Sequence, residues 1–97
     1  MDEVDYRLSE IFEALGNAIR LKLVILLEES PRSVSECAEE LDKPLQTASR
    51  HLKKLRDKDV LQAESEKNRR IYEVKRPELI RDVLRLRSHL RRTDSGD

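Results

Sequence analysis

Six polar side chains in the segment 45–57 have the chemistry of a helix that reads DNA. Apolar residues recur there at helical spacing and form one stripe, made of Leu45, Ala48, Leu52 and Leu55. The polar residues lie opposite this stripe or on its flanks: Gln46, Thr47, Ser49, Arg50, Lys53 and Lys54. Glutamine and arginine can bond base edges through paired hydrogen bonds, and lysine, serine and threonine can reach bases or phosphates. For a lone helix, a merely solvated polar face would be the more common explanation.

A second group of cations follows between two short segments of alternating hydrophobicity. Residues 60–65 and 70–75 read as strands, and Asn68 in their connection tolerates a positive φ angle. The tip of the expected hairpin holds Lys67, Arg69 and Arg70. Such a tip can lie against a phosphate backbone or place an arginine in a minor groove. Taken alone, a solvated basic tip is again the more common case.

Catalytic residues are not assembled in a recognisable pattern. The chain has no glycine-rich phosphate loop, no His–Glu metal motif and no nucleophile beside a plausible base. Ser49 and His51 are two residues apart on a helix, so their side chains face different directions. We therefore expect no enzymatic activity and no cofactor.

The single cysteine, Cys37, limits the redox and metal chemistry. One cysteine excludes an intramolecular disulfide and a thiolate zinc cluster within one chain. Its place on the inward face of an expected helix favours a buried core thiol over a metal ligand or redox switch. We expect no bound metal.

The 97 residues have zero net charge, but the charge is unevenly distributed. Residues 1–49 hold 11 acidic and 5 basic residues, whereas residues 50–97 hold 9 acidic and 15 basic ones. A locally basic surface can bind phosphate whatever the total charge. The acidic N-terminus does not resemble a signal peptide, and the longest apolar run is five residues. We expect a cytoplasmic protein with no membrane partner.

Local signals mark the elements that must position these polar groups. Gly16 is expected to end the first helix in a left-handed conformation, and Asn17 to cap the second. Ser33 and Glu36 fit a capping box, and Pro44 suits a first helical turn. The patterns predict helices at 4–15, 18–29, 34–41, 45–57 and 77–92, with an extended segment near 32–34.

The two terminal helices carry more apolar surface than a small core requires. Their stripes favour a seam between two copies of the chain, although a last helix that only covers its own core is the alternative. The residues expected at this dimer interface are Val4, Leu8, Phe12, Leu79, Val83, Leu86 and Leu90.

The order of elements predicts a mostly α fold with a β-hairpin wing, that is, a winged helix-turn-helix. Residues 1–92 are expected to form one domain and residues 93–97 a frayed polar tail. The combination of turn, polar helix and basic hairpin favours DNA binding more strongly than any of these features alone.

Three stretches resemble the ArsR-type (arsenic-repressor-like) winged-helix regulators of prokaryotes: Ala14–Leu27, Ser33–Leu61 and Asn68–Val74. The run Ser49-Arg50-His51-Leu52-Lys53-Lys54-Leu55 is the most specific part. The resemblance implies a homodimer paired through its terminal helices. It also implies two recognition helices in successive major grooves, at half-sites roughly 34 Å apart.

Residue by residue, the resemblance implies recognition-helix contacts from Gln46, Thr47, Ser49, Arg50 and His51, and wing contacts from Lys67, Arg69 and Arg70. The chain departs from the family pattern in the turn, where Lys43 and Pro44 replace an apolar residue and a Ser or Thr.

Metal-sensing relatives carry a Cys-x-Cys pair where this chain has Ser33 and Ser35, and serine is a poor ligand for soft metals. The family's other metal site needs Asp and His pairs, for which only Asp82 and His89 are available here; an ordinary surface histidine is favoured.

Two functions remain open at this point. The first is a homodimeric, sequence-specific transcriptional regulator, expected to be a repressor, that binds double-stranded DNA. Its recognition helix at about 45–57 would enter the major groove, while the wing at 66–70 would lie on the backbone or in the minor groove. The alternative is a winged-helix protein-interaction module without specific DNA binding, which the acidic front half leaves open.

Overall fold

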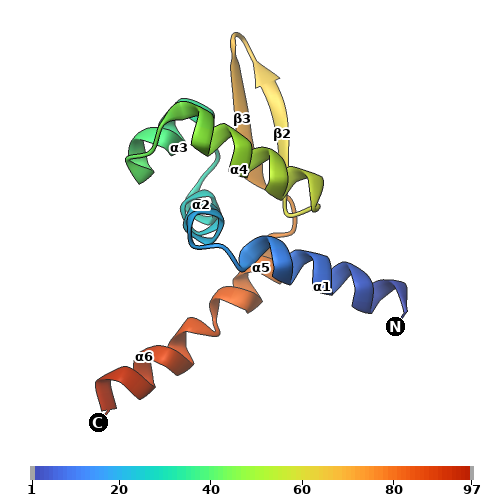
Figure 1. Ribbon diagram of the computed structural model, residues 1–97, viewed down its shortest axis with the longest axis vertical. Helices are drawn as coiled ribbons and strands as arrows, with labels where there is room; N and C mark the ends of the chain where they lie inside the picture. The colour runs from blue at the N-terminus through green and yellow to red at the C-terminus, as the bar shows by residue number, and fades with distance from the viewer. Residues whose placement is uncertain (1, 97) are drawn as a thin grey trace.

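The computed structural model describes residues 2–96 and the side chains of residues 2–91. The elements, in chain order, are α1 (Glu3–Leu15), α2 (Ala18–Glu29), β1 (Arg32–Ser33), α3 (Val34–Leu41), α4 (Leu45–Asp57), β2 (Leu61–Glu66), β3 (Arg69–Val74), α5 (Pro77–Leu84) and α6 (Arg87–Gly96). Helices α2, α3 and α4 form a body below the β2–β3 hairpin, and α1 and α6 extend away from it as two legs (Figure 1).

Helix α2 lies at the centre of the core, because apolar side chains surround it almost completely. Leu23, Val24 and Leu27 are at most 2% exposed. The neighbours that bury them come from α1, α3, α4, α5 and β3. The prediction of a central helix at 18–29 is confirmed, and the core is aliphatic apart from Cys37 and Tyr72.

Side chains cap the helices at the expected places. The Asn17 side chain accepts a hydrogen bond from the Arg20 backbone N–H at 3.1 Å. The Ser33 hydroxyl accepts from the Glu36 N–H, and the Glu36 carboxylate accepts from the Ser33 N–H, which completes the predicted capping box.

The expectation for Gly16 is wrong. It ends α1 with φ at −79° and ψ at 20°, and its N–H donates to the Glu13 carbonyl, so no left-handed residue is needed there. The left-handed conformation occurs instead at Asp42 (φ 53°) in the turn between α3 and α4 and at Asp59 (φ 68°) after α4. Aspartate is one of the few residues other than glycine that visits this region readily.

Three antiparallel strands form the sheet, in the order β1-β3-β2. The short β1 pairs Arg32 with Tyr72, so the wing is tied to the segment that enters α3. The β2–β3 hairpin runs from the Leu61–Val74 pair to the Glu66–Arg69 pair. Its positive φ angle lies at Lys67 (57°) and not at Asn68, as the sequence had suggested.

The expected single helix 77–92 is divided into α5 and α6 by a break at residues 85–86. The Arg87 Nε donates to the Leu84 carbonyl, and the Ser88 hydroxyl donates to the Arg85 carbonyl. In a continuous helix these two carbonyls would accept from N–H groups four residues later. The backbone instead makes bonds between residues three apart, such as Leu86 N–H to the Val83 carbonyl.

Helix α6 continues to Gly96, so the residues expected as a frayed tail from position 93 are helical as far as 96, and Asp97 lies outside the described residues. Within the described part of the chain, every helix is too short or too polar to cross a membrane.

Candidate nucleic-acid interface

The apolar stripe of α4 anchors this helix on the core. Ala48, Leu52 and Leu55 are at most 1% exposed. Leu45, expected as the first member of the stripe, is instead 53% exposed at the helix N-terminus. Since three buried residues at spacings of three and four fix the rotation of the helix, they also fix which residues face solvent.

The opposite face of α4 presents the predicted polar groups. Gln46, Arg50, Lys53 and Lys54 are exposed, and Thr47 and Ser49 are half-buried on the flanks. The side chains of the four exposed residues make no hydrogen bond or ion pair with any other residue that the structure describes. They are therefore available to an external partner.

His51 does not belong to this face, and its expected role as a DNA contact is corrected here. Its side chain is 8% exposed and lies on the inner side of α4, with Nδ1 3.4 Å from the Arg20 guanidinium. The Arg20 Nε also donates to the Ala14 carbonyl at 2.7 Å, so Arg20 joins α1, α2 and α4. Burial, followed by Arg20 and Arg50, lowers the pKa of His51 below its ordinary value of 6.5.

The three wing cations are not equivalent. Arg69 lies 3.9 Å from a Glu36 carboxylate oxygen and 3.8 Å from a Glu66 oxygen. Lys67 and Arg70 are exposed, and their side chains have no partner among the described residues. Lys67 and Arg70 are therefore ready to meet an anion, whereas Arg69 is held by carboxylates of its own chain.

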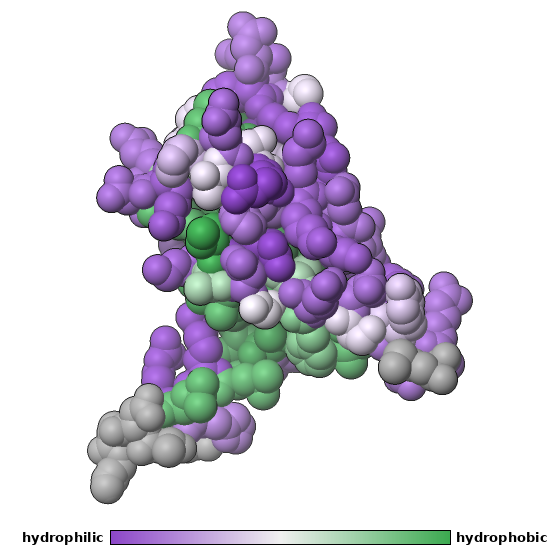
Figure 2. Space-filling view, viewed as in Figure 1, coloured by the Kyte–Doolittle hydropathy of each residue, from purple (hydrophilic) through white to green (hydrophobic). Residues whose placement is uncertain are grey.

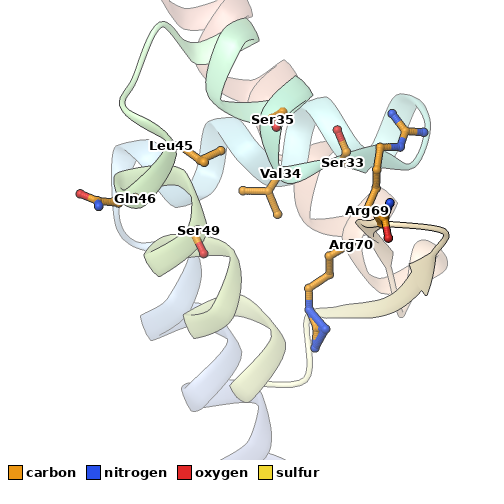
Figure 3. A pocket seen from close by; sticks show the side chains of 9 residues that line it. Ser33, Val34, Ser35, Leu45, Gln46, Ser49, Arg69 and Arg70 are labelled. Atoms are coloured by element: carbon orange, nitrogen blue, oxygen red, sulfur yellow. The ribbon is translucent and has the colours of Figure 1, made fainter.

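A hollow of about 380 Å³ separates the N-terminal turns of α3 and α4 from the wing. In Figure 3, Leu45 and Val34 lie toward one another, with Ser49 on the α4 side and Arg70 on the wing side. Hydroxyl, amide and guanidinium groups surround this apolar floor: Ser33, Ser35, Gln46, Ser49, Asn68, Arg69 and Arg70. The arrangement combines the predicted helix and wing residues in one concave surface with donors on two sides.

Sequence reasoning did not place five residues of this hollow in the site, namely Ser33, Val34, Ser35, Leu45 and Asn68. The position of Leu45 was one available signal, because the side chain of a residue in the first turn of α4 has no preceding turn of the helix to pack over.

An ion-pair cluster at Asp59 fixes the end of α4 and the root of the wing. The Asp59 carboxylate accepts from Lys75 at 2.5 Å and from the Arg76 Nε at 3.1 Å, and Arg7 of α1 lies 3.5 Å away. The hydrogen bonds from Lys75 and Arg76 lower the pKa of this carboxyl to about 2. Beside it, Lys58 binds Glu10 of α1.

The two legs carry the exposed apolar side chains expected at a dimer seam. Val4, Phe12, Leu86 and Leu90 are 49–70% exposed and Leu8 is 40% exposed, whereas Leu79 and Val83 are half-buried. Figure 2 shows apolar surface along the underside of the molecule, where α1, α5 and α6 meet. This face is unusually apolar for an isolated subunit.

The candidate metal residues do not come together in the described part of the chain. No group of three or more His, Cys, Asp and Glu side chains is placed there to hold an ion. Cys37 is fully buried, and burial raises the pKa of its thiol to about 11. Ser33 is used in the capping box, and Asp82 binds Arg85.

This fold and surface define a winged helix-turn-helix protein in which helix α4 and the wing line one exposed concave surface. The sequence profile described as "Bacterial regulatory protein, arsR family" matches residues 17–63. The chain belongs to the ArsR family of transcriptional regulators, so the predicted family and fold class are confirmed. It is a family of regulators and not of enzymes.

Several known proteins are similar to this chain. An uncharacterized HTH-type transcriptional regulator of Methanocaldococcus jannaschii is 36% identical over 65% of this chain and 70% of its own length. The homodimeric winged helix-turn-helix DNA-binding domain of a possible ArsR-family regulator from Mycobacterium bovis superposes with a TM-score of 0.84. That match covers 93% and 83% of the two chains at 23% identity. HlyU from Vibrio cholerae gives a TM-score of 0.81 over 89% and 97% at 22% identity.

Proposed function

We propose that this chain is a sequence-specific DNA-binding repressor that acts as a homodimer. The observation that carries the proposal is the unpartnered polar face of α4, which continues across a hollow to the cations of the wing. An α-helix fits the major groove of B-DNA, and a hairpin beside it reaches the adjoining backbone or minor groove.

In this arrangement Gln46 and Arg50 bond base edges, and Thr47 and Ser49 contact bases or phosphates from the flanks. Lys53 and Lys54 lie further along the exposed face and neutralise phosphates. Lys67 and Arg70 hold the neighbouring backbone, and Arg69 joins them once it leaves Glu36. His51 holds α4 on the core instead of reading a base.

Two copies pair through the apolar faces of α1, α5 and α6. The exposed Val4, Phe12, Leu86 and Leu90 would lose their contact with water in such a dimer, and burial of apolar surface is the main driving force of association. The M. bovis domain, which has the same fold, is described as homodimeric. A two-fold dimer places two α4 helices on one side, as a pseudo-palindromic operator requires.

Repression is the simplest action that these surfaces support. A dimer that binds promoter DNA through α4 and the wing would cover that DNA and so block transcription.

A selection of bound duplexes from a random pool, followed by a salt titration, tests the proposal. We expect an enriched inverted repeat with half-site centres about one helical turn apart. The logarithm of the binding constant should fall linearly with log salt, with a slope of about −0.9 per phosphate neutralised. A protein-interaction module would give neither an enriched sequence nor a steep slope.

Repression itself is tested with a reporter gene behind the selected operator. Expression should fall when the wild-type protein is present and recover with a variant that does not bind. Increased expression would show that the protein is an activator.

A further inference from the structure

A second concave surface lies at the C-terminal leg, on the side of the molecule away from the wing (Figure 1). It is a hollow of about 300 Å³ between the end of α2 and the break that joins α5 to α6. Four arginines line it: Arg81 before the break, Arg85 at the break, and Arg87 and Arg91 after it. Leu84 contributes an apolar wall and Glu28 a carboxylate.

The carboxylates nearby leave most of this positive charge unpaired. Asp82 binds Arg85, but Glu28 has no ion pair with any residue that the structure describes. The side chains of Arg81 and Arg91 have no hydrogen-bond or ion-pair partner among those residues either. Four guanidinium groups and two carboxylates give this surface a local excess of positive charge. A surface that only contacts water would not need such an excess.

The cluster is separate from the two surfaces already assigned. The proposed DNA-binding surface consists of α4 and the wing, at the opposite end of the molecule (Figure 1). The apolar seam uses Leu86 and Leu90, whereas Arg87 and Arg91 occupy a different face of α6 at helical spacing. A dimer formed across the leucines therefore leaves the arginine hollow open to solvent.

We infer that this hollow binds a compact anion that carries at least two phosphate groups. Planar guanidinium groups match phosphate oxygens through paired, charge-assisted hydrogen bonds, and the hollow is near the lower end of the size range of ligand sites. One phosphate group lies between Arg81 of α5 and Arg85 at the break, and the next between Arg87 and Arg91 of α6. Such a ligand bridges the break and fixes the angle between the two helices.

Free pyrophosphate and a nucleoside diphosphate share this chemistry, and titration calorimetry at constant ionic strength distinguishes them. Inorganic pyrophosphate and ADP are titrated into the full-length protein, with orthophosphate as the reference. We expect one saturable site per chain, with pyrophosphate or ADP bound at least tenfold more tightly than orthophosphate. Preference for ADP over pyrophosphate would identify a nucleotide site. Equal weak heats from all three anions would overturn the inference, because they would indicate an adventitious attraction to positive charge.

Two paired variants locate the site. Arg81→Gln with Arg91→Gln should weaken pyrophosphate binding at least tenfold and leave binding to operator DNA unchanged. The matched control, Arg50→Gln with Arg70→Gln, should retain pyrophosphate binding and lose DNA binding. Loss of pyrophosphate binding in the control, or loss of DNA binding in the Arg81 and Arg91 pair, would contradict a separate site. Circular dichroism confirms that both pairs remain folded, since all four side chains are exposed.

Discussion

In the proposed complex with DNA, base recognition depends most directly on Arg50. It lies on the exposed face of α4, two residues before the buried Leu52, and has no side-chain partner in the described chain. Guanidinium can form two hydrogen bonds to a guanine in the major groove, and lysine supplies the same charge without the paired geometry.

Replacement of Arg50 by alanine should therefore relax the base preference at one position of each half-site, at a cost of about 1–3 kcal/mol. Arg50→Lys is the matched control, because it keeps the attraction to phosphate. We expect the lysine variant to bind random DNA like the wild type but to lose the base preference. Measured affinities for operators with each base at that position check this, and an unchanged preference in both variants would mean that Arg50 faces the backbone.

His51 was predicted to be exposed, although its spacing from the apolar residues of α4 indicates that it is buried. The residues buried on α4 are Ala48, His51, Leu52 and Leu55, which recur at intervals of three and four. An imidazole in that series is expected to face the core by periodicity, but the family resemblance placed it among the DNA contacts on the outer face. The residue that accommodates it, Arg20, is 31 positions away, and no local pattern indicates such a contact.

At the scale of elements, the contact between α3 and the wing restrains one of the wing cations of the candidate DNA-binding surface. Arg69 belongs to β3 and Glu36 to the capping box of α3, so one carboxylate both stabilises a helix N-terminus and holds a wing cation. The hydrogen bonds from Ser33 lower the pKa of the Glu36 carboxyl, and Glu36 is therefore charged at neutral pH.

The variant Glu36→Gln should strengthen DNA binding without loss of the helix cap. Glutamine can accept the Ser33 N–H in a capping box, but it carries no charge to hold Arg69. We expect tighter binding to all sequences and a salt dependence steeper by about one unit of slope. The same change in an Arg69→Gln background should have a much smaller effect. An equal gain in both backgrounds would show that only the general negative charge of Glu36 matters.

The Asp59 cluster links three elements: the end of α4, the root of the wing and α1. Its carboxyl has a lowered pKa in the folded chain, of about 2 against an ordinary value of 3.8. The stabilisation is therefore complete above about pH 4 and is lost as the pH falls toward 2.

Replacement of Asp59 by asparagine tests this cluster, because asparagine tolerates the left-handed backbone at that position. At pH 7 the free energy of unfolding should fall by about 1 kcal/mol, since water screens these partly exposed ion pairs. The difference from the wild type should disappear between about pH 4 and pH 2. Asp57→Asn is the control, with a single contact of 3.7 Å to Arg56 and an expected change close to zero. If the variant were less stable than the wild type by the same amount at every pH, Asp59 would stabilise the fold through its shape and not through its charge.

The helices that could be predicted from the sequence are those whose stabilising contacts involve residues close to one another in the chain. The capping box at Ser33 and the apolar stripes of α1, α2 and α3 place these helices from neighbouring residues alone. The break between α5 and α6, where the side chains of Arg87 and Ser88 donate to the carbonyls of Leu84 and Arg85, was not predictable. An apolar stripe passes through residues 85–86 without interruption, so periodicity gives no sign of it.

At the scale of the whole molecule, the proposed pairing through the apolar faces of α1, α5 and α6 is what would let the protein bind two half-sites. Phe12 contributes a large side chain to this face and is 49% exposed in the subunit. Tyr6 is similarly exposed, at 57%, but lies on another face of the same helix.

Phe12→Asp should therefore separate the dimer without unfolding the subunit, because the new carboxylate would be buried only in the interface. We expect a monomer by sedimentation at low micromolar concentration and the loss of cooperative binding to a two-half-site operator. Tyr6→Asp should remain dimeric and bind normally. A dimeric Phe12→Asp protein would place the interface elsewhere.

The break at residues 85–86 also bears on how many genomic sites such a dimer can occupy. With a rigid terminal helix, the two α4 helices of a dimer would be held at one separation. An operator whose two half-sites were one base pair closer or further apart would then bind poorly. The structure has instead a two-residue turn in this leg. In the proposed dimer, small rotations about the turn would vary the separation, so that operators with slightly different spacers would bind equally well and one regulator would serve a larger and more degenerate set of promoters.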